Sequence, residues 1–124
     1  MYKIAVIEDA EDNRDLLYYL LCDEFNVARF SNGEEALRHF ADEAPDLIVL
    51  DIWLPGMDGI EVLKKVRQQQ HLQRTPVLAL TANAMSGDRE KYLSEGFTDY
   101  VAKPITDVDN FVCRVRRLLI SGNN

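Results

Sequence analysis

Five polar side chains follow apolar runs of the sequence, at positions where they could do chemistry together. Glu8 and Asp9 come directly after one such run, and Asp51 comes after another. Thr81 ends a third run, and Lys103 follows a fourth. Three carboxylates brought close together repel one another unless a cation lies between them. Because carboxylate oxygens are hard ligands and no His or Cys lies nearby in the sequence, the cation they favour is Mg²⁺, which commonly bridges to phosphate.

The apolar runs before these side chains have the pattern of strands in a parallel sheet. They are short, rich in Val and Ile, and apolar at consecutive positions, which is typical of strands covered on both faces. The carboxyl ends of parallel strands meet at one edge, where open α/β sheets bind their ligands. A single acid there usually marks only the start of a loop, but five suitable residues on four strand ends favour a site. The predicted strands cover residues 4–7, 27–30, 47–50, 77–80 and 100–102.

Helix signals lie between the predicted strands. A polar residue followed three positions later by an acid is a capping pattern, and a glycine after a helical run can end a helix in a left-handed turn. Five helices alternating with five strands predict a doubly wound α/β fold with a parallel sheet. The expected helices cover residues 11–22, begin at the caps Asn32 and Asp58, cover residues 87–95 up to Gly96, and begin at the cap Thr106.

The length and composition are those of one globular domain. We expect residues 1–120 to form the domain and residues 121–124 to be a polar tail. The formal net charge of −7 disfavours direct binding to nucleic acid or to an anionic membrane surface. No apolar stretch approaches a membrane span and the start runs into a strand, so we expect no signal peptide and a cytoplasmic location. Cys22 and Cys113 lack metal-type spacing and are expected to be reduced thiols.

The polar residues at the strand ends belong to a larger set of motifs. The loop after Asp51 is rich in turn signals, and no glycine-rich nucleotide loop is present. Lys103 precedes a proline, where a cis peptide bond is possible. The motif residues are the Glu8-Asp9 pair, Asp51, the run Leu54-Pro55-Gly56-Met57-Asp58-Gly59, Thr81-Ala82, Tyr100 and Lys103-Pro104. Over essentially its whole length, the chain closely resembles the receiver domain of bacterial-type two-component response regulators, which implies the strand order 2-1-3-4-5.

The resemblance implies a role for each motif residue. Asp51 would attack a phosphoryl group carried by a histidine of a partner protein and form an acyl phosphate. Thr81, the backbone amide of Ala82 and Lys103 would bind the phosphoryl oxygens. Tyr100 would turn inward as Thr81 moves toward the phosphate, which would remodel the face formed by the fourth helix, the fifth strand and the last helix. The Mg²⁺ ligands would be Glu8, Asp9, the Asp51 carboxylate and the backbone carbonyl of Trp53.

The resemblance also implies partners. A histidine kinase or a histidine phosphotransfer protein would supply the phosphoryl group, and a downstream protein target would recognise the switched face of a monomer or weak dimer. The chain would catalyse only its own phosphorylation and dephosphorylation, so it is not expected to be an enzyme. Residues 81–85 and 87–89 resemble receivers of relay proteins and hybrid kinases. Arg114, Arg116 and Arg117 form a basic patch that is either a solvated face or part of an interface for an acidic partner.

Two other functions remain open. A Mg²⁺-dependent phosphatase with an aspartyl-phosphate intermediate could use a similar sheet, although such enzymes usually have an acid where this chain has Trp53. A receiver-like interaction module that is never phosphorylated would not need all five site residues. Two departures from the family pattern stand out. Glu8 replaces the Asp of many relatives, which affects the geometry at the metal, and the bulky Trp53 is expected to shield the acyl phosphate from water.

Overall fold

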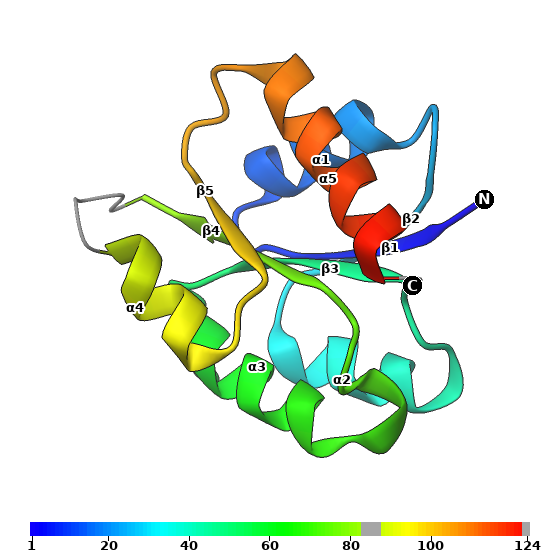
Figure 1. Cartoon of the computed structure of the whole chain (residues 1–124), viewed down its shortest axis with the longest axis vertical. Helices are drawn as coiled ribbons and strands as arrows, with labels where there is room; N and C mark the ends of the chain where they lie inside the picture. The colour runs from blue at the N-terminus through cyan, green and yellow to red at the C-terminus, as the bar shows by residue number, and fades with distance from the viewer. Residues whose placement is uncertain (83–87, 123–124) are drawn as a thin grey trace.

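Five strands alternate with five α-helices in the computed structural model, which describes residues 1–82 and 88–122 (Figure 1). Each predicted strand is confirmed to within one residue at either end. In chain order the elements are β1 (Lys3–Ile7), α1 (Glu11–Leu21), β2 (Asn26–Phe30), α2 (Gly33–Asp42), β3 (Leu47–Asp51), α3 (Gly59–Gln68), a short 3-10 helix (Gln70–Leu72), β4 (Val77–Thr81), α4 (Asp88–Glu95), β5 (Asp99–Ala102) and α5 (Val108–Gly122).

The strands form one parallel sheet in the order β2-β1-β3-β4-β5. This confirms the doubly wound fold and the strand order expected from the sequence. Helices α1 and α5 cover one face, whereas α2, α3 and α4 cover the other (Figure 1). Every residue of β3 and β4 is buried, because both faces of these strands are covered. Double coverage therefore explains why their apolar residues are consecutive rather than alternating.

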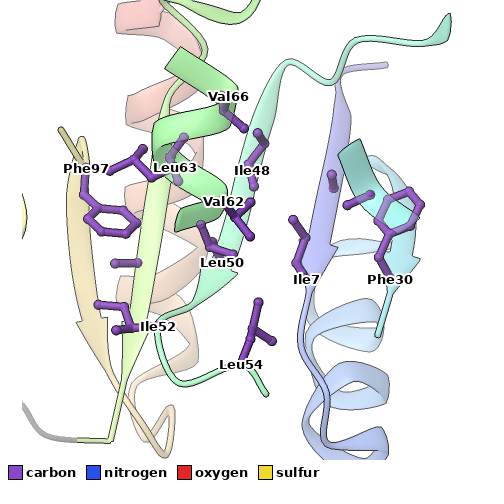
Figure 2. Close-up of a cluster of buried hydrophobic side chains, with 14 of the residues drawn as sticks. Ile7, Phe30, Ile48, Leu50, Ile52, Leu54, Val62, Leu63, Val66 and Phe97 are labelled. Carbon is purple, nitrogen blue, oxygen red and sulfur yellow. The ribbon is translucent and has the colours of Figure 1, made fainter. Parts of the chain in front are cut away.

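The two faces of the sheet bury two separate cores. Successive strand residues point to opposite faces, so Val49 packs with the α1 and α5 side while its neighbours Ile48 and Leu50 pack with the other. Figure 2 shows the second core, where Val62, Leu63 and Val66 of α3 lie against β3 and Phe97 lies nearby. The first core is formed by Ile4, Val6, Leu17, Leu21, Phe25, Leu47, Val49, Leu78, Leu80, Phe111, Val115 and Leu119.

Side-chain caps begin α2 and α3 as the sequence predicts. The Asn32 side chain accepts a hydrogen bond from the backbone N–H of Glu35 at 2.8 Å, and Asp58 accepts one from Glu61 at 2.9 Å. These bonds satisfy donors that the first helical turn leaves unpaired. Gly96 follows α4 with a φ of +117°, so the expected left-handed end of that helix is confirmed. Residue 87, the expected start of that helix, lies outside the described residues.

The predicted cap of the last helix is wrong by one residue. Asp107, rather than Thr106, accepts a hydrogen bond from the backbone N–H of Asn110 at 3.0 Å, and α5 begins at Val108. Both side chains can cap, and the Asp carboxylate is the stronger acceptor. At its other end α5 runs to Gly122, two residues into the segment expected to be a polar tail.

The expected basic patch on α5 is largely paired within the chain. Arg114 forms an ion pair with Asp99 at 3.0 Å, and Arg116 donates two hydrogen bonds to the Glu24 carboxylate at 2.7 and 2.6 Å. Two of the three arginines are therefore already paired, which weakens the interpretation of this patch as an interface for an acidic partner.

Neither cysteine forms a disulfide bond. Cys22, partly buried, and Cys113, exposed, are both free thiols. Within residues 1–82 and 88–122, no helix combines the length and the apolar character that crossing a membrane requires.

Candidate functional site

The parallel register brings the polar strand ends together. Because β1 pairs with β3, Glu8 after β1 lies beside Asp51, the last residue of β3. Thr81 is the last residue of β4, and its backbone carbonyl accepts a hydrogen bond from the N–H of Lys103 at 2.8 Å. Asp9 is exposed beside Glu8. The structure thus places these five residues at one edge of the sheet, on the strand ends named from the sequence.

Lys103 links the two buried acids. Its ammonium nitrogen lies 3.0 Å from Oδ2 of Asp51 and 3.4 Å from both carboxylate oxygens of Glu8. Glu8 and Asp51 are 0% and 2% exposed, so neither carboxylate can rely on bulk water for its solvation. Buried charges persist in proteins only when they are paired. The Lys103–Pro104 peptide bond is cis, as the sequence allows.

The electrostatics of this cluster favour additional positive charge. Burial, followed by the neighbouring Asp51 carboxylate, raises the pKa of Glu8 from 4.5 to about 7, although Lys103 and Asn13 oppose the rise. Burial alone would lower the pKa of Lys103, but its hydrogen bonds and charge interactions with Asp51 and Glu8 raise it above its usual range. One lysine therefore does not fully compensate the acids, and the protonated form of Glu8 is favoured over a wider pH range than for an ordinary glutamate.

The acids also have the spacing of a metal site. One carboxylate oxygen from each of Glu8, Asp9 and Asp51 can lie within 4.8 Å of the others. This compact set of hard oxygen ligands fits Mg²⁺. The loop after β3 lies against the cluster, because the backbone N–H of Trp53 donates a hydrogen bond to Oδ1 of Asp51 at 3.1 Å. The Trp53 side chain is 61% exposed beside the site.

Two residues of α1 that the sequence analysis did not single out support the acidic pair. The Asn13 side chain donates a hydrogen bond to Oε1 of Glu8 at 3.2 Å. The Arg14 guanidinium donates hydrogen bonds to the backbone carbonyl oxygens of Glu8 at 3.0 Å and Asp9 at 3.4 Å. These contacts fix both the carboxylate and the loop that carries it. Their position in the sequence could have identified them, because the first turn of a helix that follows a strand lies near the end of that strand.

Gly59 lets α3 pack directly on the backbone of Asp51. A Cβ atom at Gly59 would lie 2.6 Å from the Asp51 carbonyl oxygen and 2.6 Å from Cα of Ile52. The backbone N–H of Gly59 also donates a hydrogen bond to the Ile52 carbonyl at 3.0 Å, which closes the loop at its base. The glycine of the Asp58-Gly59 motif is therefore required by close approach of the backbone.

Thr81 contacts a buried tyrosine that the sequence analysis missed. Its hydroxyl oxygen lies 3.4 Å from the hydroxyl of Tyr92 on α4, and both residues are buried. The Tyr92 ring lies 6.0 Å from the ring of Tyr100, which is half-buried on β5. Ala82 is exposed. The run likened to relay receivers continues into residues 83–87, which lie outside the described part of the chain.

Comparisons with known proteins show which family this fold belongs to. Residues 4–116 match the response regulator receiver domain family. The phosphate regulon transcriptional regulatory protein PhoB of Rhizobium meliloti (strain 1021) is 38% identical over 118 residues, which are 94% of this chain and 52% of PhoB. This chain thus spans about half the length of that relative.

Solved structures show the same similarity. A putative response regulator from Chloroflexus aurantiacus J-10-fl has a TM-score of 0.89 and 31% identity, with 96% of this chain and 98% of that chain covered. The receiver domain of the sensor histidine kinase PA1611 from Pseudomonas aeruginosa PAO1 has a TM-score of 0.85 and 32% identity, with 95% and 97% covered. It holds a magnesium ion in its active-site cleft. The chain belongs to the response regulator receiver domains, which are phosphoacceptor modules of two-component signalling.

Proposed function

We propose that Asp51 is the phosphoryl acceptor of this receiver domain. The observation that carries the proposal is the contact set of its carboxylate, which is buried at the end of β3, bonded to Lys103 at 3.0 Å and grouped with two further acids. A carboxylate held in this way has a fixed orientation. Its negative charge is balanced by a lysine that can transfer its contact to an incoming anion.

The reaction that fits this arrangement is transfer from a phosphohistidine. An oxygen of the Asp51 carboxylate forms a bond to phosphorus while the bond from phosphorus to the histidine nitrogen of the donor breaks. That nitrogen keeps the electron pair and takes up a proton, so the donor leaves with a neutral imidazole. Lys103 moves its contact to a phosphoryl oxygen, and the Thr81 hydroxyl and Ala82 N–H donate to the others. Attack of water on phosphorus later releases phosphate and restores the Asp51 carboxylate.

The proposed magnesium ligands are Glu8, Asp9, the Asp51 carboxylate and the backbone carbonyl of Trp53. The compact oxygen cluster and the ion in the PA1611 receiver support this assignment. A bound Mg²⁺ supplies positive charge that stabilises the phosphoryl oxygens during transfer. Asn13 and Arg14 hold Glu8 and its loop in the required orientation.

The proposed partners follow from the family. A histidine kinase or a histidine phosphotransfer protein supplies the phosphoryl group, and a downstream protein target binds the remodelled surface around Tyr100. We propose that the domain acts in the cytoplasm as a monomer or weak dimer. The kinase-borne receiver of PA1611 supports a role in a relay, and the putative response regulator of Chloroflexus aurantiacus J-10-fl supports a role as a regulator.

The direct test is incubation with acetyl phosphate and Mg²⁺, followed by intact-mass measurement. We expect one covalent phosphoryl adduct that disappears with EDTA or with Asp51→Asn. The matched control is Asp42→Asn, at an exposed aspartate that ends α2, which should keep the adduct. Absence of an adduct with both acetyl phosphate and a phosphorylated histidine kinase would contradict the proposal.

A further inference from the structure

We propose that Tyr92 is a positioning residue that holds Thr81 in the unphosphorylated state, so that Thr81 reaches the phosphoryl group only when its contact with Tyr92 breaks. The inference rests on the proposed function in one respect, namely that Thr81 becomes a phosphoryl ligand. It adds a residue of α4 to the group that decides whether the domain switches.

The contact lies in the interior of the domain. Tyr92 is 4% exposed and Thr81 is 0% exposed, and their hydroxyl oxygens are 3.4 Å apart. Among the described residues, every buried side-chain nitrogen and oxygen has a hydrogen-bond partner. For the Tyr92 hydroxyl that partner is Thr81. A threonine hydroxyl can donate one hydrogen bond and accept two, so the contact with Tyr92 need not be the one contact of the Thr81 hydroxyl.

The backbone of Thr81 is held while its side chain can rotate. The Thr81 carbonyl accepts the hydrogen bond from Lys103, and β4 is paired with β3 on one side and β5 on the other. The Thr81 hydroxyl therefore approaches a phosphoryl group on Asp51 mainly by a change of rotamer, for which a β-branched side chain has few stable alternatives. A rotamer that faces the phosphoryl group separates the Thr81 hydroxyl from Tyr92.

That separation is unfavourable inside the second core, on the face of the sheet covered by α2, α3 and α4. A buried hydroxyl without a partner is unfavourable, so Tyr92 either stays unpaired or moves to find a new partner. Its ring packs edge-to-face on Phe97, with 6.1 Å between centroids, and lies 6.0 Å from Tyr100. Movement of Tyr92 is therefore passed to α4 and to Tyr100 on β5. The Thr81–Tyr92 contact thus opposes switching, and its loss links the phosphoryl group to both elements.

The test measures binding of beryllofluoride, an acyl-phosphate mimic, in the presence of Mg²⁺. Trp53, the one tryptophan of the chain, reports binding by fluorescence, and the backbone amide NMR signals of α4 give an independent readout. Tyr92→Phe keeps the ring that packs on Phe97 and removes only the hydroxyl. We expect it to tighten apparent binding by about 2- to 10-fold, the equivalent of one neutral hydrogen bond. Tyr19→Phe, on the exposed side of α1, is the matched control and should change nothing.

A double-mutant cycle separates this role from general packing. In a Thr81→Ala background, Tyr92→Phe should no longer change the binding constant, because the contact it removes is already absent. Unchanged or weaker binding by Tyr92→Phe would overturn the inference, and so would equal tightening with and without Thr81. Failure of the wild type to bind beryllofluoride would overturn the proposed function, and this inference with it. Binding without a Tyr92 effect would overturn this inference alone.

Discussion

The interiors of the central strands and their carboxyl ends differ in chemistry but not in burial. In β1, β3 and β4 the interior residues are apolar and at most 1% exposed. Within one residue of the strand end, these strands continue to Glu8, Asp51 and Thr81, which are almost as deeply buried. The interiors stabilise the fold by removing apolar surface from water. Two of these ends place a carboxylate where burial is unfavourable, so the apolar interiors must offset that loss of stability. In these strands the interior residues therefore serve stability, whereas the residues at the carboxyl ends form the candidate site.

The largest expected effect comes from a change in a strand interior. Leu78 of β4 is fully buried in the core under α1 and α5, three residues before Thr81. Leu78→Ala should lower the free energy of unfolding by about 2–5 kcal/mol because it leaves a cavity. Urea denaturation measures this loss. Below the unfolding transition, phosphorylation by acetyl phosphate should be unchanged; a large change would show that interior and end are not separable.

A change at a strand end should raise the free energy of unfolding rather than lower it. The pKa of Glu8 is raised to about 7 in the folded protein, so protonation of Glu8 stabilises the folded state relative to the unfolded state. In the metal-free protein this contribution is fully present below pH 4.5 and is lost as the pH rises through about 7. Glu8→Gln should therefore raise metal-free stability by about 1–3 kcal/mol at alkaline pH and hardly at all near pH 4.5.

Thermal unfolding at several pH values, with and without Mg²⁺, measures this difference. Mg²⁺ favours ionised Glu8, so it should stabilise the wild type increasingly as the pH rises through about 7. The stabilisation by Mg²⁺ should be smaller in Glu8→Gln. Equal pH profiles for the two proteins would contradict the assignment of the raised pKa to Glu8.

Lys103 should compete with the metal for the same acids. Lys103→Met removes an ammonium that lies 3.0 Å from Asp51 and 3.4 Å from Glu8. Mg²⁺ should then bind about tenfold more tightly, because a repulsion between like charges is removed. Phosphorylation should nevertheless fall, because a phosphoryl oxygen loses its positive partner. Calorimetric titration measures the binding of Mg²⁺, and the intact-mass assay measures phosphorylation. Weaker Mg²⁺ binding by Lys103→Met would contradict the competition between Lys103 and the metal.

The smallest effect is expected at the exposed rim of the site. Trp53 is 61% exposed and its backbone N–H is bonded to Asp51. If its ring shields the acyl phosphate from water, Trp53→Ala should shorten the lifetime of the adduct a few-fold. Tyr19→Ala, another exposed aromatic, is the control. A lifetime equal to that of the wild type would exclude shielding.

The sheet and the edge residues could be predicted from the sequence because both follow from local patterns. Consecutive apolar residues identify doubly covered strands, and parallel strands bring their carboxyl ends together whatever the loops contain. Tyr92 could not be predicted in this way. Its neighbours on α4 are mostly polar, and its partner Thr81 lies eleven positions earlier on a different element. The prediction of Thr106 as the cap was wrong because the exact start of α5 cannot be read from two adjacent residues that can both cap a helix.

The close approach at Gly59 restricts how the backbone at Asp51 can move. There is no space for even a methyl group between α3 and the Asp51 backbone, so on the proposed mechanism β3 could not shift toward α3 when a doubly charged group is attached to Asp51. The same backbone is held on its other side, where the N–H of Ile52 is bonded to the carbonyl of Leu80 at 3.0 Å. Because the backbone is held on both sides, we expect a phosphoryl group on Asp51 to be accommodated by rearrangement of side chains on β4, α4 and β5. On the proposed mechanism, this rearrangement would run from Asp51 through Thr81 to Tyr92 and Tyr100.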